Sequence, residues 1–240
     1  MRALAFAFLL APVAADAAVC RDTSFEGASY TLCEVTADED LRLFHSGPDG
    51  AYGSFRNVDA ALGAEGKALG FAMNAGMYHR DLAPVGLYVE NGVEVSKIVT
   101  SDGPGNFGLL PNGVFCIGET FRVVESRAFK RERPECRYAT QSGPMLVIEG
   151  ELHPRLLPDS DSTYVRNGVG VSADGQRAVF AISNDAVNFH SFARFFRDEL
   201  GLPNALYFDG NISRLYAPEM GRHDGGFPMG PMVGTVVPRG

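Results

Sequence analysis

The chain of 240 residues contains no tryptophan, so any aromatic surface that stacks on a ligand must come from its 8 tyrosines and 17 phenylalanines. It also lacks an excess of positive charge, since its formal net charge is -8. An acidic surface repels the phosphates of nucleic acid, which excludes broad nucleic-acid binding. A small phosphate-bearing ligand remains possible, because one or two well-placed arginines are enough to hold it.

Beyond the N-terminus, the sequence has no apolar run long enough to cross a membrane. The N-terminus itself has the three parts of a signal peptide in order: Arg2, the apolar stretch Ala3–Ala15, and small residues at Ala15 and Ala17. We therefore predict a signal peptide over residues 1–17, a mature domain over residues 18–240 and a periplasmic or secreted location. The alternative is a buried N-terminal helix.

Closely spaced cysteine pairs are also missing, which argues against a zinc site. The four cysteines form an even set, as expected for an oxidising compartment, and they allow three disulfide connectivities. We favour Cys20–Cys33 and Cys116–Cys136, because each pair closes a short loop between segments that are predicted to be neighbouring strands.

Repeated hairpin signals dominate the rest of the chain. Asn91-Gly92, Asn112-Gly113 and Asp174-Gly175 each separate two apolar runs, and Asn-Gly favours the type I′ turn of a β-hairpin. The flanking runs predict the following strands: 85–90 and 93–98, 106–111 and 114–117, and 169–172 and 178–182.

Two segments have helical spacing. Residues 54–62 place apolar side chains on one face, and residues 189–200 carry a phenylalanine stripe between Asn188 as N-cap and Gly201 as terminator. Many hairpins with a few helices predict an α+β fold, a single domain with a largely antiparallel or mixed sheet. No linker divides the chain.

Four segments join an apolar run to a glycine turn with a polar residue at the junction, a position where binding sites are commonly built. Each also fits a structural turn or loop. In chain order, their polar and glycine residues are Asn74; Gln141, Ser142 and Gly143; Arg166; and Asp209, Gly210 and Ser213.

The residue types in these segments indicate different roles. An arginine before a strand is suited to hold a phosphate, and a carboxylate at the end of an apolar strand is costly unless it is paired or used. Ser142 lacks the G-x-S-x-G pattern of a nucleophile elbow, so we expect it to bind rather than attack. Asp159 and Asp161 lack the full calcium-loop pattern and predict a solvated turn, so no metal or cofactor is expected.

Taken in order, the segments resemble the motifs of the phosphodiester glycosidase family. The resemblance extends from Leu69 to Tyr216. No single motif is specific to the family, but the occurrence of five motifs in this order is specific. The matching stretches are Asn74–Tyr78, Pro84–Gly92, Ser142–Leu146, Arg166–Gly175 and Asp209–Ser213. The last departs from the family at Asn211-Ile212, where relatives have glycines.

This resemblance implies a hydrolase that cleaves the bond between a sugar's anomeric carbon and phosphate in a sugar phosphodiester or phosphoglycan. It implies catalytic roles for Asp209 and Arg166, and substrate-binding roles for the following residues: Asn74, Gln141, Ser142, Gly143, Gly210 and Ser213. The alternative function is a non-catalytic periplasmic glycan-binding or polysaccharide-assembly protein on the same fold.

Overall fold

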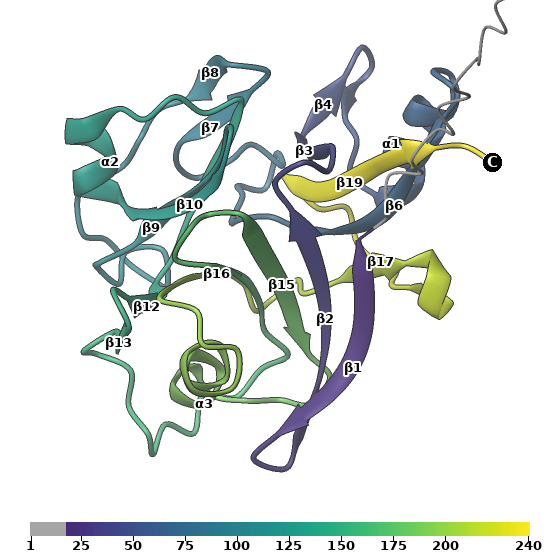
Figure 1. The fold of residues 1–240 in the computed structure, drawn as a ribbon. Helices are drawn as coiled ribbons and strands as arrows, with labels where there is room; N and C mark the ends of the chain where they lie inside the picture. The colour runs from purple at the N-terminus through teal and green to yellow at the C-terminus, as the bar shows by residue number, and fades with distance from the viewer. Residues whose placement is uncertain (1–17) are drawn as a thin grey trace, which may run out of the picture.

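The computed structural model describes residues 18–240, and the predicted signal peptide over residues 1–17 lies outside this range. The described chain forms three main sheets, a small two-stranded ribbon and short helices in a single compact domain (Figure 1). Every strand pair in it is antiparallel. The predicted α+β class is confirmed, and the sheets are antiparallel rather than mixed.

The largest sheet has seven strands in the order β1-β2-β15-β14-β16-β12-β13. Its strands come from both halves of the chain: β1 (Val19–Phe25), β2 (Ala28–Thr36), β12 (Met145–Ile148), β13 (Glu151–Leu152), β14 (Asn167–Val171), β15 (Arg177–Ser183) and β16 (Asn204–Asp209). The predicted hairpin at Asp174-Gly175 joins β14 to β15, with Gly175 at φ 72°. A glycine adopts this left-handed conformation at little cost.

The second sheet has five strands in the order β10-β9-β11-β7-β8. Its strands are β7 (Tyr88–Glu90), β8 (Val93–Ser96), β9 (Gly113–Ile117), β10 (Phe121–Glu125) and β11 (Tyr138–Ser142). The predicted turn at Asn91-Gly92 is confirmed, because both residues have positive φ, 51° and 77°, as a type I′ turn requires.

The predicted hairpin at Asn112-Gly113 is wrong. Residues 106–111 form turns and bends rather than a strand, and Gly113 is the first residue of β9. The side chain of Asn112 is fully buried, where it donates to the carbonyl of Phe107 and accepts from the hydroxyl of Ser126. Asn112 therefore serves as a buried hydrogen-bonding residue instead of a turn residue, and this choice depends on distant neighbours that local sequence does not reveal.

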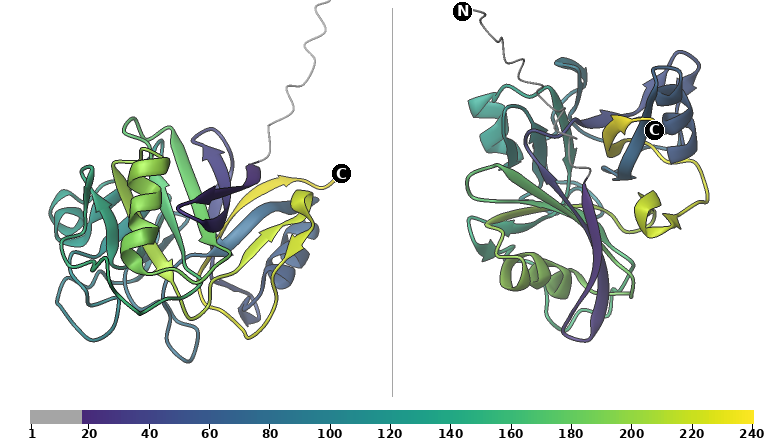
Figure 2. Two further views of the ribbon diagram at one scale, coloured as in Figure 1. Left: turned by 90° about the horizontal axis from the view of Figure 1, so that it is seen from below. Right: turned by 45° about the vertical axis from the view of Figure 1, so that its right-hand side comes forward.

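The third sheet has the order β18-β17-β6-β19-β3 and lies beside the first (Figure 2). Its strands are β3 (Leu41–Phe44), β6 (Lys67–Asn74), β17 (Leu215–Ala217), β18 (Arg222–His223) and β19 (Met232–Pro238), and the small ribbon consists of β4 (Ser46–Gly47) and β5 (Gly50–Ala51). The C-terminal strand β19 lies between β3 and β6 and pairs with both. This pairing joins the end of the chain to its early part.

Helices cover the sheets at three places. Helix α1 (Phe55–Gly63) confirms the helix predicted over residues 54–62, and it begins at Ser54, whose side chain accepts from the N–H of Asn57. Helix α3 (Phe189–Arg194) begins at the predicted cap Asn188 and continues as a π-helical turn over Phe195–Glu199. Helix α2 (Ser126–Glu132) has a mixed charged sequence and was not predicted. None of the helices in residues 18–240 is long and apolar enough to cross a membrane.

A phenylalanine cluster joins the three sheets. The ring of Phe180 on β15 lies 5.1 Å from that of Phe71 on β6 and 5.7 Å from that of Phe115 on β9, measured between centroids. Phe115 also meets Phe208 on β16 at 6.5 Å, and all four side chains are fully buried. One core therefore includes residues from every sheet, as expected for a single domain.

Both predicted disulfides are present, Cys20–Cys33 and Cys116–Cys136. The first joins directly opposed residues of β1 and β2. The second joins β9 to the segment that precedes β11, its neighbour in the sheet. Neighbouring strands bring both pairs together, which was the reason for preferring this connectivity over the other two.

Candidate active site

A pair of buried asparagines lies where the first and third sheets meet. Asn74 is the last residue of β6 and Asn167 the first of β14, and both are fully buried. The Nδ2 of Asn167 donates to the backbone oxygen of Asn74 at 2.9 Å and to its Oδ1 at 3.0 Å. Because each strand supplies one member, this amide pair fixes the end of one sheet against the other.

The turn from Asp209 to Arg214 crosses between the same two sheets, from β16 to β17. The backbone N–H of Asp209 donates to Oδ1 of Asn167 at 3.2 Å, and that of Arg214 donates to Oδ1 of Asn74 at 2.9 Å. The hydroxyl of Ser213 donates to the backbone oxygens of Asp209 and Val165, at 2.7 and 3.0 Å. The asparagine pair therefore holds both ends of the turn.

The carboxylate of Asp209 is partly buried at the start of this turn. Its Oδ1 accepts hydrogen bonds from the N–H groups of Gly210, at 2.6 Å, and Asn211, at 2.9 Å. Burial raises the pKa of Asp209, although the backbone N–H donors of the turn oppose the shift. The structural alternative considered for this residue, a turn closed by its own side chain, is thus present, and it holds the carboxylate in one orientation.

Arg166 is fully buried, with 1% of its surface exposed. Its Nε donates to the carbonyl of Val187 and its Nη2 to that of Ser162, both at 2.8 Å, and the guanidinium lies 3.7 Å from the centroid of the Phe189 ring. Within residues 18–240 it forms no ion pair with a carboxylate. Burial lowers its pKa, the direction expected for a cation removed from water.

The third nitrogen of Arg166 faces the turn of Asp209. Nη1 lies 3.4 Å from the hydroxyl of Tyr207, a distance at which it donates weakly. A Cβ on Gly210 would lie 2.1 Å from that hydroxyl and 3.7 Å from Nη1, so only glycine fits here. Burial raises the pKa of Tyr207, the charge of Arg166 opposes the shift, and the charge of Asp209 adds to it.

Ser142 joins the second sheet to this region. It is the last residue of β11, it is fully buried, and its hydroxyl donates to the backbone oxygen of Phe208 at 2.8 Å. Next to it, Gly143 packs so closely on Asn112 that a Cβ would lie 2.5 Å from the asparagine Cβ. The hydrogen bond of Ser142 to a carbonyl holds β11 against β16, and its bonded partner is not a base that could activate it.

Gln141 points to the opposite face of β11, because neighbouring residues of a strand alternate. Its Oε1 accepts from the N–H groups of Leu87, at 3.0 Å, and Val99, at 2.9 Å, and its Nε2 donates to the hydroxyl of Ser126 at 2.9 Å. These contacts hold the segment that contains the β7–β8 hairpin. The structure therefore separates Gln141 from Asp209 and Ser213, which lie around the asparagine pair, and Gly143 packs on Asn112 beside Gln141.

The aspartates Asp159 and Asp161 are exposed, as expected for a solvated turn. No group of three or more histidine, cysteine, aspartate or glutamate side chains in the described part of the chain is placed to hold a metal ion.

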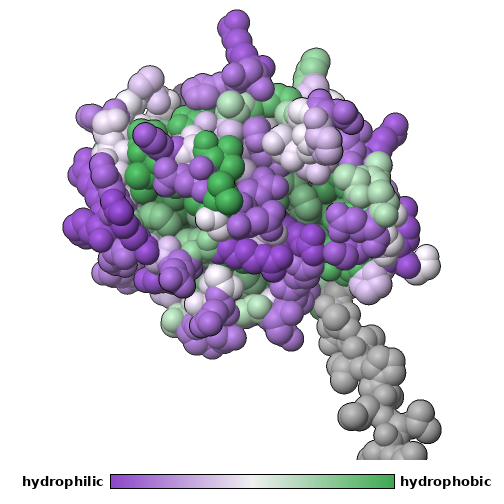
Figure 3. Space-filling view, turned by 90° about the horizontal axis from the view of Figure 1, so that it is seen from above, coloured by the Kyte–Doolittle hydropathy of each residue, from purple (hydrophilic) through white to green (hydrophobic). Residues whose placement is uncertain are grey.

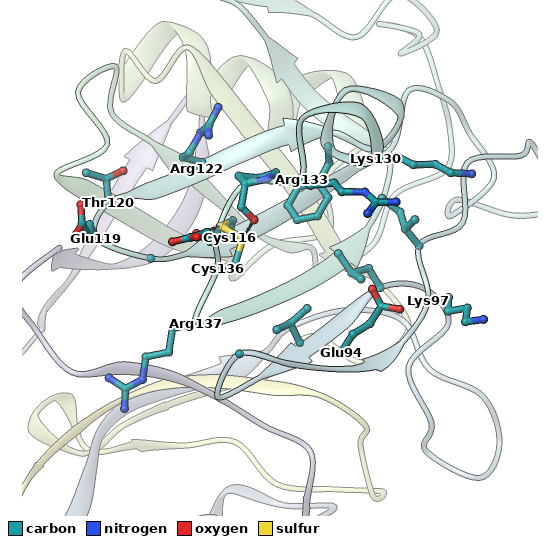
Figure 4. Close-up of a pocket in the computed structure, with 18 residues that line it drawn as sticks. Glu94, Lys97, Cys116, Glu119, Thr120, Arg122, Lys130, Arg133, Cys136 and Arg137 are labelled. Atoms are coloured by element: carbon teal, nitrogen blue, oxygen red, sulfur yellow. Dashed lines mark hydrogen bonds between the residues drawn. A yellow bond between two sulfur atoms is a disulfide. The ribbon is translucent and has the colours of Figure 1, made fainter.

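A groove of about 1380 Å³ lies on the second sheet and α2, and none of the candidate residues lines it. Lys97, Lys130, Arg133 and Arg137 surround it, with the Cys116–Cys136 disulfide at its floor (Figure 4). The face of the molecule seen from above is mixed, with apolar residues in green exposed among polar residues in purple (Figure 3). The candidate site lies outside this groove and is defined by buried polar groups that converge.

Two residues that hold the site together, Asn167 and Tyr207, were not among the residues that the sequence singled out. Tyr78 also lies in this region, because it packs against the same apolar cluster as Ile212 of the turn; burial raises the pKa of its phenol. The position of Asn167 at the end of a strand, as for Asn74, is the sequence feature that could have identified it as a site residue.

Comparison with known proteins places these features in context. The sequence model described as phosphodiester glycosidase matches residues 68–226. The Escherichia coli (strain K12) protein named "Uncharacterized protein YigE" is 37% identical over 206 residues, which covers 85% of this chain and 79% of that protein.

Two solved structures share the fold. The zebrafish N-acetylglucosamine-1-phosphodiester alpha-N-acetylglucosaminidase catalytic domain, described as auto-inhibited by its pro-peptide, superposes with a TM-score of 0.60 at 12% identity, covering 90% of this chain and 81% of that one. A hypothetical protein from Synechocystis superposes with a TM-score of 0.59 at 15% identity, covering 91% of this chain and 61% of that one.

Proposed function

Since the chain belongs to the phosphodiester glycosidase family, we propose that it is an exported hydrolase that cleaves the bond between a sugar's anomeric carbon and phosphate in an extracytoplasmic glycan. The observation that carries the proposal is the convergence of Asp209, Arg166 and Tyr207 on one turn. The carboxylate is suited to the positive charge that develops at the anomeric carbon, and the cation and the phenol are suited to the negative charge of the leaving phosphate.

The leaving phosphate makes the smaller demand on the protein. Phosphate departs far more readily than a sugar alkoxide, so the reaction needs less help from a general acid than ordinary glycoside hydrolysis does. It needs positive charge and hydrogen-bond donors near the departing oxygen. Arg166 supplies the charge, and the Tyr207 hydroxyl, which accepts from Nη1, keeps its own hydrogen for a phosphate oxygen.

This role for Arg166 differs from a two-pronged grip on phosphate. Nε and Nη2 already donate to backbone carbonyls, so the buried guanidinium acts through Nη1 and the adjacent phenol. The ring face of Phe189 attracts the cation, but no carboxylate pairs with it within residues 18–240, so its positive charge is not neutralised. A buried charge without a counterion attracts an anionic ligand.

The anomeric carbon makes the larger demand, because positive charge develops there as the bond to phosphate breaks. Asp209 is the carboxylate proposed to stabilise that charge and to activate water. Two backbone N–H groups hold its Oδ1, so its orientation is set before the substrate binds. Asn74, Ser142, Gly143, Gly210 and Ser213 form the surrounding frame, whereas Gln141 supports the frame from the other face of β11.

Export is part of the same proposal. The N-terminal pattern of residues 1–17 and the two disulfides both fit a periplasmic or secreted protein.

A second candidate is a non-catalytic glycan-binding or assembly protein on this fold. The observation that favours it is the altered turn, in which Ile212 packs against the apolar cluster of α1 and β6. A residue that anchors the turn in the core restricts the space beside Asp209.

Hydrolysis of an N-acetylglucosamine-1-phosphodiester decides between these functions. We expect the purified mature protein to release N-acetylglucosamine, and the Asp209→Asn variant to release none above background. Binding of the diester without turnover, over varied sugars, would support the second candidate instead.

A further inference from the structure

The outer face of the second sheet is only partly covered by other elements. Neighbouring residues of a strand face opposite sides of a sheet. Tyr88 on β7 and Phe115 on β9 belong to the main core, whereas the residues that follow them, Val89 and Cys116, belong to a separate small cluster with Phe129 of α2. Residues of α2 and of β7, β8, β9 and β10 line the groove of about 1380 Å³, so the groove lies on this outer face, beside the helix.

The groove gathers positive charge in an acidic protein. The chain has a formal net charge of -8, yet five basic and three acidic side chains line the groove. All eight are exposed, and they are Lys97, Arg122, Lys130, Arg133 and Arg137, with Glu94, Glu119 and Glu135. Within residues 18–240, Arg122 is the one of the five cations that forms an ion pair, with Glu132 at 3.6 Å. Four cations without a paired carboxylate therefore surround one hollow, which attracts a chain of negative charges.

The backbone that carries two of these cations is held in place. Arg133 ends α2 in the left-handed conformation, with φ 46°, and its N–H donates to the carbonyl of Phe129 at 2.9 Å. The N–H of Arg137 donates to the carbonyl of Ile117, and its own carbonyl accepts from the N–H of Gly92, both at 2.8 Å. The second disulfide ties the segment between the two arginines to β9. The positions from which both side chains extend are therefore set before a ligand binds, which lowers the cost of binding.

The lining favours a peptide over a glycan or a membrane surface. Its floor is apolar, with contributions from Leu87, Val89, Ile98 and Phe129, so a ligand gains by placing apolar groups there. Among the described residues that line the groove, none is a tyrosine, tryptophan, asparagine or glutamine, the side chains that supply aromatic faces and amide hydrogen bonds to sugars. A membrane surface contacts side chains that protrude, whereas these apolar groups lie at the floor of a hollow.

We propose that this groove is a docking surface for a segment of a partner protein in which acidic residues flank apolar ones. The acidic side chains pair with Lys97 and Lys130, which extend from opposite walls at one end of the groove, and with Arg137 at the other end (Figure 4). The apolar side chains of the segment cover the floor. None of the candidate active-site residues lines the groove, so the partner binds independently of the proposed hydrolysis.

Selection from a library of displayed random peptides tests the proposal, with the mature protein as bait. We expect the retained peptides to be enriched in aspartate and glutamate together with aliphatic residues or phenylalanine. A synthetic copy of the most enriched peptide is then titrated by fluorescence anisotropy. The double substitution Lys130→Glu and Arg133→Glu should weaken its binding about 10-fold or more, because two attractions become repulsions. Added salt should weaken it as well.

A matched control reverses the same amount of charge elsewhere. Arg56 and Arg155 are exposed, lie outside the groove and form no ion pair within residues 18–240. The double substitution Arg56→Glu and Arg155→Glu should bind the peptide like the parent. A second peptide, with serine in place of each apolar residue, tests the floor and should bind about 10-fold more weakly. Thermal unfolding of each variant shows that it is folded.

The proposal is overturned if acidic peptides are not enriched, if parent and groove variant bind the peptide equally, or if groove and control variants lose binding equally. Tighter binding of the groove to phosphatidylglycerol vesicles or to polygalacturonate than to the peptide, lost in the same groove variant, would overturn it in favour of a membrane or an anionic glycan. Turnover of a sugar phosphodiester should be the same in the parent and the groove variant. Failure of the proposed enzyme would therefore leave the docking surface standing.

Discussion

Asp209 and Asn167 have different roles in the candidate site, one in the proposed chemistry and one in structural support. Asp209 carries the charge, while Asn167 contacts the backbone of Asp209, the amide of Asn74 and its backbone oxygen. A buried amide with all of these partners is a frame residue, since leaving any of them unpaired is costly. The chemistry and its support therefore belong to different side chains.

Replacing Asp209 by asparagine should lower turnover by about 10³-fold or more, because only the charge is lost. The amide oxygen still accepts from Gly210 and Asn211, so the melting temperature at neutral pH should stay equal or rise. Turnover and thermal unfolding are measured together. Asp174→Asn is the matched control, since Asp174 also precedes a glycine and accepts from the backbone, at Gln176. Unchanged turnover in a folded Asp209→Asn protein would remove Asp209 from the mechanism.

The same variant tests the raised pKa of Asp209. A carboxyl whose pKa is higher in the folded state binds its proton more readily there than in the unfolded chain. Its contribution to stability is therefore full below the unfolded pKa and is lost as pH rises through the folded pKa. The unfolding free energy of the parent should fall relative to that of Asp209→Asn across this window. Denaturant unfolding at several pH values measures it, and parallel curves would contradict the shift.

Arg166 should matter for stability as well as for function. Arg166→Ala removes the side-chain donor to the carbonyl of Ser162 and one of the two donors to that of Val187, and it opens a cavity beside Phe189, so we expect a loss of about 3 kcal/mol. Arg166→Lys keeps the charge but lacks the planar guanidinium that donates to two carbonyls at once. It should recover neither the stability nor the turnover in full. Arg177→Lys, at an exposed ion pair with Glu34, should change stability by less than about 0.5 kcal/mol. An Arg166→Lys protein as stable and active as the parent would contradict both roles.

At the scale of elements, the strands that end at the site matter more than the helices. β6, β11, β14 and β16 each end or begin with a polar residue of the site, namely Asn74, Ser142, Asn167 and Asp209. Strand ends at the meeting of sheets combine rigid support with access for a ligand. The helices instead cover apolar faces, as α3 does with Phe192, which belongs to the same buried cluster as Leu146 and Val147.

The disulfides constrain other strands: Cys20–Cys33 joins β1 to β2, and Cys116–Cys136 joins β9 to the segment before β11. Replacing both cysteines of either pair by alanine should lower the unfolding free energy by about 2–4 kcal/mol, because each closes a loop in the unfolded chain. β1 is an edge strand with β2 as its neighbour in the sheet, so loss of Cys20–Cys33 should also speed amide exchange in β1. Exchange measured by mass spectrometry checks this, with the Cys116–Cys136 variant as control. Equal exchange of β1 in both variants would contradict it.

At the scale of the whole molecule, one core should give one unfolding transition. Phe180 is fully buried against Phe71 and Phe115, which belong to the other two sheets. Phe180→Ala should therefore lower the unfolding free energy by about 3–5 kcal/mol and shift a single calorimetric transition. Phe227→Ala, at an exposed ring, should shift it little. Two separate transitions, with only one displaced, would show that residues 18–240 are not one folding unit.

The sequence by itself determined what depends on neighbours along the chain. The turn at Asn91-Gly92, the caps at Ser54 and Asn188 and the hairpin at Asp174-Gly175 follow from local backbone preferences and side-chain hydrogen bonds. Both disulfides followed because they join segments close in sequence. The order of motifs also pointed to the family that the comparisons show.

Only the tertiary structure decided which polar residues meet. Asn74 and Asn167 are 93 positions apart, and no local signal pairs them. No local signal shows that Gln141 faces away from the turn of Asp209 and bonds to Leu87. None shows that the Arg166 guanidinium is buried and donates to a backbone carbonyl instead of remaining free for a ligand. Local sequence determines a residue's own backbone conformation, whereas the face it presents and the partners it finds depend on how distant strands pair and how sheets pack.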